Sequence, residues 1–94
     1  MLPSKPGFDW DAHNAGHIGR HGVRPGEAEE VLSRQPLTLR ESDTGWERRW
    51  VKIGETAAGR VLVVVHTFRA GKIRVVTAYP ANRSQRSAYR RLRS

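Results

Sequence analysis

The chain has 94 residues, of which 17 are Lys or Arg and nine are Asp or Glu, and its net charge is +8. It contains no cysteine, which excludes disulfides and thiolate metal sites. Its longest strictly apolar run, Val61–Val65, is far shorter than the roughly 20 residues of a membrane-spanning helix. The start of the chain lacks the apolar segment of a signal peptide. We therefore expect a soluble, cytoplasmic, single domain over residues 1–94, with residues 1–7 flexible.

The charge is unevenly distributed along the chain. Residues 1–55 contain eight Lys or Arg and nine Asp or Glu, whereas residues 56–94 contain nine Lys or Arg and no acid. Such segregation creates a local field that attracts polyanions, and nucleic acid is the commonest polyanion in a cell. The same composition also increases solubility, so the charge alone leaves both interpretations open.

Two helices are predicted before the first strand. The first covers residues 8–21 with Asp9 as its N-cap, and it ends before Gly22 because glycine readily adopts the left-handed conformation that closes a helix. The second begins at Pro25 and ends near Ser33, with acidic residues in its first turn. Its buried stripe is expected to consist of Ala28, Val31 and Leu32.

From Leu37 onward the hydrophobic pattern changes to a period of two, which predicts strands. Four strands are predicted. The first starts at Leu37, and the other three cover residues 48–53, 61–69 and 72–79. A tight turn at Ala70-Gly71 joins the last two. Pro80 ends the sheet, and Asn82 with Gln85 caps a final helix. The order predicts an α+β fold: two N-terminal helices, a four-stranded antiparallel sheet with helices on one face, and a C-terminal helix.

The hairpin around Ala70-Gly71 pairs Arg69 with Lys72 and Thr67 with Arg74, and paired residues share a face. One face therefore ends in three cations that suit a phosphate, because arginine donates two hydrogen bonds to its oxygens. The other face is expected to carry Leu62, Val64, His66, Phe68, Ile73, Val75, Thr77 and Tyr79. On this face His66 is either an acid–base group or a core histidine bonded to the backbone.

The final helix is predicted to be amphipathic, with its arginines on one arc and a docking face on another. The arginine row consists of Arg83, Arg86, Arg90 and Arg93. The docking face consists of Ala88, Tyr89 and Leu92. Charged helix faces are commonly only solvated, but they usually mix signs. A row of one sign repels itself unless an anion binds, which favours ligand contact.

Three histidines, His13, His17 and His21, recur at the spacing i, i+4, i+8 and share a helix face. Without cysteines or a neighbouring HExxH glutamate, this spacing is typical of surface histidines, so we expect neither a metal nor another cofactor. RNA cleavage without a metal needs a base for the 2′-hydroxyl, cations for the phosphate and an acid for the leaving oxygen. His, Arg and Tyr side chains supply all three.

Several segments resemble the BrnT-type toxins. FDWDAHNAGHIGRHGVRPGEAEEVL is similar to the opening of that family, and ERRWVKIGET, RVLVVVHTFR and KIRVVTAYPANRSQRSAYRR are similar to its later strands and closing helix. The resemblance implies a fold related to the RelE-like ribonuclease toxins, a type II toxin–antitoxin context and a ribbon-helix-helix (BrnA-like) antitoxin. The positions that match the family by type are Arg20-His21, Glu47-Arg48, Arg69, Arg74, Arg86 and Tyr89. Tyr79 and Gln85 replace its usual arginine and glutamate.

We therefore predict a metal-independent endoribonuclease toxin that cleaves RNA and inhibits translation and growth. Arg74 and Arg69 are expected to clamp phosphate, and Tyr79 or His66 to transfer protons. Contacts to RNA are expected from Arg83, Arg86, Tyr89, Arg90, Arg48, Arg49 and His21. Two alternatives stay open: a catalytically inactive module of the same fold that binds nucleic acid or docks an antitoxin, and an interaction domain whose basic face binds an acidic protein.

Overall fold

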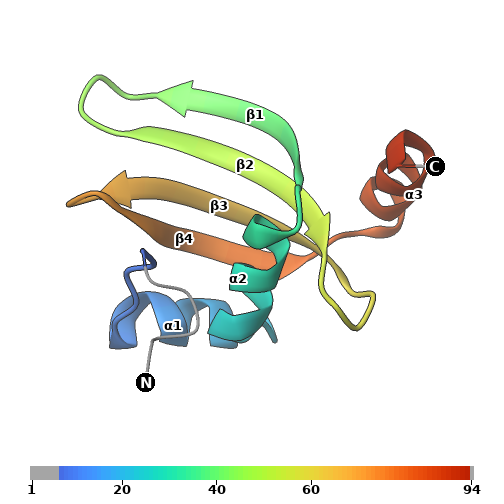
Figure 1. Ribbon diagram of the computed structural model, residues 1–94, viewed down its shortest axis with the longest axis horizontal. Helices are drawn as coiled ribbons and strands as arrows, with labels where there is room; N and C mark the ends of the chain where they lie inside the picture. The colour runs from blue at the N-terminus through green and yellow to red at the C-terminus, as the bar shows by residue number, and fades with distance from the viewer. Residues whose placement is uncertain (1–6, 94) are drawn as a thin grey trace.

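The computed structural model describes residues 7–93, which form three helices and one four-stranded antiparallel sheet (Figure 1). The helices are α1 (Ala12–Gly19), α2 (Pro25–Ser33) and α3 (Arg83–Arg93). The strands are β1 (Leu37–Asp43), β2 (Arg48–Glu55), β3 (Val61–Arg69) and β4 (Lys72–Pro80), in the sheet order β1-β2-β3-β4. The predicted α+β layout and element order are confirmed. Of residues 1–7, which are expected to be flexible, residues 1–6 lie outside the described part of the chain, and the Gly7 carbonyl accepts a hydrogen bond from the Ile73 N–H.

Helix α1 begins later than predicted, because Asp11 and not Asp9 is its N-cap. The Asp11 carboxylate accepts hydrogen bonds from the backbone N–H groups of His13 and Asn14, and the Asn14 side chain accepts from the Asp11 N–H in return. The residues before this cap extend the sheet instead. Phe8 forms a parallel bridge with Ile73, and the Ile73 N–H donates to the Gly7 carbonyl at 2.7 Å.

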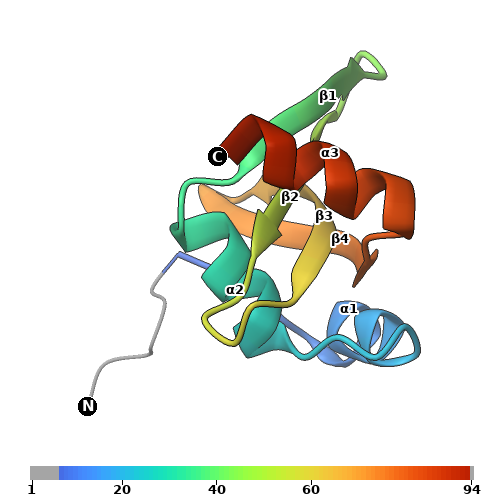
Figure 2. The same ribbon diagram turned by 90° about the vertical axis from the view of Figure 1, so that its right-hand side faces the viewer.

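The helices cover both faces of the sheet, so the prediction that they cover one face is wrong (Figure 2). Helices α1 and α2 pack on Leu62 and Val64, whereas α3 packs on Val61 and Val63. Successive residues of a strand point to opposite sides, so these two clusters lie on opposite faces. The apolar run of β3 explains the arrangement, because a strand that is apolar on both sides must be covered on both. We name the two sides the α1/α2 face and the α3 face.

The β3–β4 hairpin has the predicted register at its tip, where Arg69 pairs with Lys72 and Thr67 with Arg74. A β-bulge then shifts the register, so that Val65 pairs with Thr77 and Val63 pairs with Tyr79. One extra residue in a strand reverses the faces of all residues beyond it. Thr77 and Tyr79 therefore lie on the α3 face, and their predicted placement beside Leu62 and Val64 is wrong.

Helix α3 is capped as predicted: the Asn82 N–H donates to Gln85 Oε1 at 2.9 Å, and the Gln85 N–H donates to Asn82 Oδ1 at 2.8 Å. Tyr89 is 4% exposed and docks the helix on the α3 face. Leu92 is 70% exposed, so its predicted role in docking is wrong. The last turn of α3 is held by a polar contact instead, in which Arg93 donates to the Gln35 carbonyl.

Gly54, near the end of β2, lies against α2 without room for a side chain. A Cβ there would be 3.0 Å from Val31 Cγ1 and 3.1 Å from Pro36 Cβ. We expect Gly54→Ala to lower the free energy of unfolding in urea titrations by about 1–3 kcal/mol. Gly16→Ala in α1 is the control, since a Cβ there would meet no atom within 4 Å apart from its chain neighbours and the backbone of its own helix, and it should stabilise by about 0.5–1 kcal/mol. Destabilisation by both changes to the same degree would contradict this packing.

Candidate nucleic-acid interface

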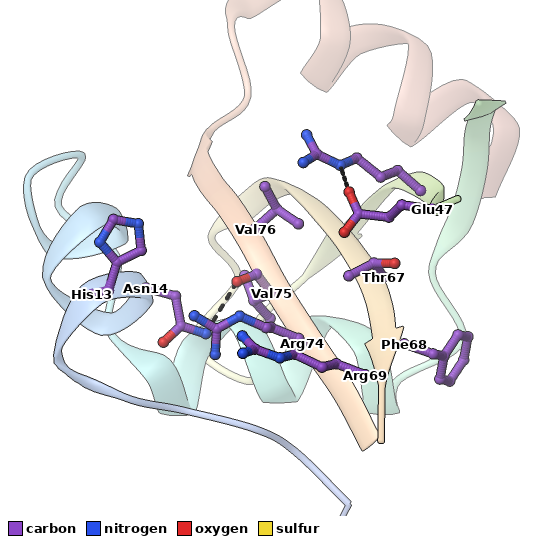
Figure 3. Close-up of a pocket in the computed structure, with 10 residues that line it drawn as sticks. His13, Asn14, Glu47, Thr67, Phe68, Arg69, Arg74, Val75 and Val76 are labelled. Atoms are coloured by element: carbon purple, nitrogen blue, oxygen red, sulfur yellow. Dashed lines mark hydrogen bonds and ion pairs between the residues drawn. The ribbon is translucent and has the colours of Figure 1, made fainter. Parts of the chain in front are cut away.

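A cavity of about 390 Å³ opens on the α3 face near the tip of the β3–β4 hairpin (Figure 3). Its lining consists of His13, Asn14, Glu47, Arg49, Thr67, Phe68, Arg69, Arg74, Val75 and Val76. Three of these residues are arginines, and they come from the neighbouring strands β2, β3 and β4. Strand alternation directs every second residue to this side, so the three arginines leave their strands on one face and line one cavity although they are distant in sequence. This space suits a phosphate.

A second depression, of about 530 Å³, lies between the end of α1, the start of α2 and the β2–β3 loop. Two arginines line it, and both pair with Glu27: Arg60 donates two hydrogen bonds, of 2.9 and 2.8 Å, to the Glu27 carboxylate, and Arg24 Nε lies 3.9 Å from it. Because this carboxylate is nearly buried, the charge of Arg60 is already compensated inside the protein. We therefore take the arginine cavity on the α3 face as the candidate site.

Arg74 is held in place by the segment that precedes α1. Its side chain is 13% exposed and forms ion pairs with Asp9 at 3.4 Å and with Asp11 at 3.1 Å. The backbone N–H of Asn14 lowers the pKa of Asp11, and Arg74 lowers it further, so the carboxylate stays ionised at neutral pH. Arg74 therefore enters the cavity with a fixed orientation and with part of its charge shared by two carboxylates.

The other two arginines differ in their acidic partners. Arg49 Nε lies 2.5 Å from a carboxylate oxygen of Glu47, which also lines the cavity. Arg69 is exposed and has no acidic partner among residues 7–93. Arg69 is thus the cavity arginine whose charge is most available to a bound anion.

Asn14 connects α1 to β4 and sets the position of the cavity rim. It is 2% exposed, and its Nδ2 donates to the carbonyls of Asp9 at 3.0 Å and Val75 at 3.1 Å (Figure 3). Val75 directly precedes the extra residue of the bulge, where the strand ladder is interrupted. The same hydrogen bonds hold the neighbouring His13 at the edge of the cavity.

The two residues predicted to transfer protons do not line this cavity. His66 is 6% exposed and lies on the α1/α2 face, where its ring stacks on Trp50. Tyr79 is half-buried against the core of the α3 face, and its ring meets His21 edge-on at 6.4 Å. Arg69 and Arg74 are brought together as expected, but with Glu47 and His13 as the titratable neighbours.

The α3 arginines predicted to contact RNA lie on the exposed side of the helix. Arg83 is exposed and has no acidic partner in the described part of the chain. Arg86 donates to the Ala81 carbonyl at 2.7 Å, and Arg90 lies 3.7 Å from the Glu55 carboxylate. Arg86 and Arg90 are therefore tethered loosely to the protein while they remain open to solvent.

The other residues predicted to contact RNA are dispersed. Tyr89 is buried beneath α3, so it supports the helix and offers no surface to RNA. Arg48 lies on the α1/α2 face and pairs with Glu41 at 2.5 Å. His21 is exposed just beyond the end of α1. Of the predicted contact residues, Arg49 joins Arg69 and Arg74 in the cavity.

His17, in α1, contacts both β4 and His21, which lies just beyond the end of that helix. His17 Nε2 lies 3.1 Å from the Thr77 hydroxyl, and the rings of His17 and His21 meet edge-on at 5.2 Å. Within residues 7–93, no three His, Cys, Asp or Glu side chains are grouped as metal ligands. In the same part of the chain, no helix has both the length and the apolar character needed to cross a membrane.

We expect His66 to make the free energy of unfolding depend on pH. Burial lowers the pKa of His66 below its ordinary value of 6.5, and the nearby Lys52 lowers it further. The unfolded chain therefore takes up this proton at a higher pH than the folded chain, so stability is complete above about pH 6.5 and falls as the pH decreases below it. We expect urea titrations to show this fall between about pH 7 and pH 5. His66→Phe keeps a stacked ring on Trp50 and should abolish the fall; an unchanged slope would assign it to another group.

A comparison with known protein families identifies the chain. The model of the family described as the ribonuclease toxin BrnT of type II toxin–antitoxin systems matches residues 10–85. The chain belongs to the BrnT family. No curated protein sequence matches it. The matched range contains the whole lining of the arginine cavity.

Membership of the BrnT family places the chain among ribonuclease toxins and implies an RNA substrate and an antitoxin partner. The two departures noted from the BrnT pattern occupy structural positions here. Gln85 completes the cap of α3, and Tyr79 packs against the core of the α3 face. Neither side chain lines the cavity, so these two departures leave its three arginines in place.

Proposed function

We propose that the chain is a metal-independent endoribonuclease that cleaves RNA at the arginine cavity. One observation carries this proposal: arginines from three adjacent strands line a single cavity together with two groups able to exchange protons, Glu47 and His13. Cations for the phosphate, a base and an acid are the requirements for cleavage by the neighbouring 2′-hydroxyl. Family membership supports RNA as the substrate.

Arg69 and Arg74 bind the phosphate in this proposal. Arg69 contributes an uncompensated charge, and Arg74 contributes a guanidinium that Asp9 and Asp11 hold in a fixed orientation. A fixed donor costs little reorganisation when negative charge develops on the phosphate oxygens. Arg49 has a different task, because its contact with Glu47 at 2.5 Å orients that carboxylate toward the cavity.

Glu47 and His13 transfer the protons. Figure 3 shows His13 on one side of strand β4 and Glu47 on the other, and both residues line the cavity. The Glu47 carboxylate takes the proton of the 2′-hydroxyl, whose oxygen forms a bond to phosphorus. The bond from phosphorus to the 5′-oxygen breaks, and His13 donates a proton to that oxygen. The products are a 2′,3′-cyclic phosphate and a free 5′-hydroxyl.

Cleavage of cellular RNA in the cytoplasm stops translation and growth, and the partner that prevents it is proposed to be a ribbon-helix-helix protein of the BrnA type. The family resemblance supports this partner. A second function is favoured by Tyr79, which stands where the family usually has arginine: the chain then binds RNA or an antitoxin without cutting RNA. Both functions use the same cationic surface.

The test is an assay of the purified chain with a short RNA in the presence of EDTA. We expect cleavage that EDTA does not inhibit and products that carry a 2′,3′-cyclic phosphate. An RNA with a single 2′-deoxy position should stay intact at that position. Cleavage that needs a divalent metal, or that cuts the 2′-deoxy position, would overturn the mechanism. Binding without cleavage would favour the second function.

A further inference from the structure

A second group of side chains with nucleic-acid chemistry lies on the α1/α2 face, near the same end of the sheet. The rings of Trp50 and His66 stack at 5.4 Å with an angle of 15° between their planes. Phe68 meets both rings edge-on, at 5.2 Å from Trp50 and 5.7 Å from His66. We name these three residues the aromatic shelf. Helices α1 and α2 leave it partly open, since Phe68 is 55% exposed.

The shelf is an uncharged π-surface bordered by cations. Burial lowers the pKa of His66, so its ring is neutral at physiological pH. The Arg48 guanidinium lies 5.2 Å from the centre of the Trp50 ring, and Lys52 lies on the same face of β2. Glu41, which pairs with Trp50 across the strands, is engaged by Arg48 at 2.5 Å. Aromatic rings with flanking cations on an open sheet face are the combination that binds unpaired bases.

The position of the shelf connects it to the arginine cavity. Phe68 directly precedes Arg69 in β3, so the two side chains leave the strand on opposite faces. Phe68 is among the residues that line the cavity, but Figure 3 shows its ring pointing away from the space that Arg69 and Arg74 enter. A nucleic-acid strand with one phosphate in the cavity therefore reaches the shelf by passing over the tip of the hairpin. Arg69 and Lys72 at that tip add positive charge along the path.

We propose that the aromatic shelf binds an unpaired base of the RNA, stacked on Phe68, on a nucleotide that flanks the phosphate held in the cavity. This inference rests on the proposed function, because it takes RNA as the ligand. Stacking on the shelf would add a contact with a base to the cavity's contacts with the RNA phosphates. Because only an unpaired base can stack there, the protein would prefer single-stranded RNA. An apolar segment of a partner protein is the other possible occupant, but the cations that border the shelf favour a polyanion.

The experiment measures binding of a short single-stranded 2′-O-methyl RNA, which cannot be cleaved, and of the same oligonucleotide with abasic residues. Phe68→Ala should weaken binding of the first probe about fivefold or more, the effect of losing one stacked base. The same variant should bind the abasic probe as the unaltered chain does. Phe68→Tyr keeps the ring and should retain binding of both probes. Because Phe68 is 55% exposed, all three proteins should be fully folded at the temperature of the binding assay, which thermal melting checks.

Unchanged binding of the first probe by Phe68→Ala would overturn the proposal, and so would an equal loss with both probes. Loss of binding to a cognate antitoxin with unchanged binding of RNA would assign the shelf to a protein partner and overturn it as well. Arg69→Ala separates this proposal from the cavity. It should weaken binding of both probes, since both keep their phosphates. If Arg69→Ala has no effect while Phe68→Ala weakens only the first probe, the cavity assignment fails and the stacking assignment stands.

Discussion

RNA cleavage by the Arg69→Ala variant is expected to fall about 100- to 1,000-fold below that of the unaltered chain. Arg69 lines the cavity, is exposed and has no acidic partner among residues 7–93, so its whole charge is available to the phosphate. For the same reason its removal breaks no internal contact, and the free energy of unfolding should change by less than about 0.5 kcal/mol. Single-turnover cleavage of a short RNA and urea titration measure the two effects.

Lys72→Ala is the matched control for this change. Lys72 pairs with Arg69 across the hairpin and is also an exposed cation, but it does not line the cavity. We expect its cleavage rate to stay within about threefold of the original, because a surface charge outside the site acts only through a screened field. Similar losses in both variants would show that the hairpin acts by its overall charge and not through a phosphate site.

Asn14→Ala is expected to lower the free energy of unfolding by about 2–4 kcal/mol. The Asn14 side chain is 2% exposed and makes three hydrogen bonds to backbone groups of Asp9, Asp11 and Val75. Alanine leaves these groups without partners, and each unpaired buried group costs about 1–3 kcal/mol, less where water enters. Urea titration at neutral pH measures the loss.

His13→Ala tests the neighbouring position on the same helix turn. Because His13 is exposed, its removal should change the free energy of unfolding by less than about 0.5 kcal/mol. The proposed mechanism expects the opposite pattern for cleavage, with a loss of about 100-fold or more in folded His13→Ala protein. If Asn14→Ala were no more destabilising than His13→Ala, the anchoring role of Asn14 would be wrong.

Local physics made much of the fold predictable. The hairpin register follows from the two-residue turn at Ala70-Gly71, and the cap of α3 follows from the spacing of Asn82 and Gln85. The bulge in β4 has no such local cause in the sequence. One contact that stabilises the bulge is the hydrogen bond from the Asn14 side chain to the Val75 carbonyl, and these two residues are 61 positions apart in the sequence. A contact of that separation is invisible to a pattern of neighbouring residues.

The part of the candidate site that lies on the β3–β4 hairpin was predictable from the sequence, whereas the part contributed by other elements was not. Strand alternation brings Arg69 and Arg74 together, and it also separates His66 from them, because His66 is one residue out of phase with Thr67. Glu47 and His13 enter the cavity from a turn and from a helix at the sheet edge, whose positions tertiary packing decides. The placement of helices on both faces did have a signal, since the run Val61–Val65 is apolar at every position.

The bulge in β4 also has a consequence for the end of the chain. It gives the two halves of the strand opposite parity: odd-numbered Val75 faces the α1/α2 core, whereas odd-numbered Tyr79 faces the α3 core. A strand without the extra residue would present Tyr79, and then the start of α3, to the side that α2 already occupies. Deleting one residue at Val76 would therefore do more than shorten an edge strand. It would direct the last helix, with its five arginines, to the wrong side of the sheet.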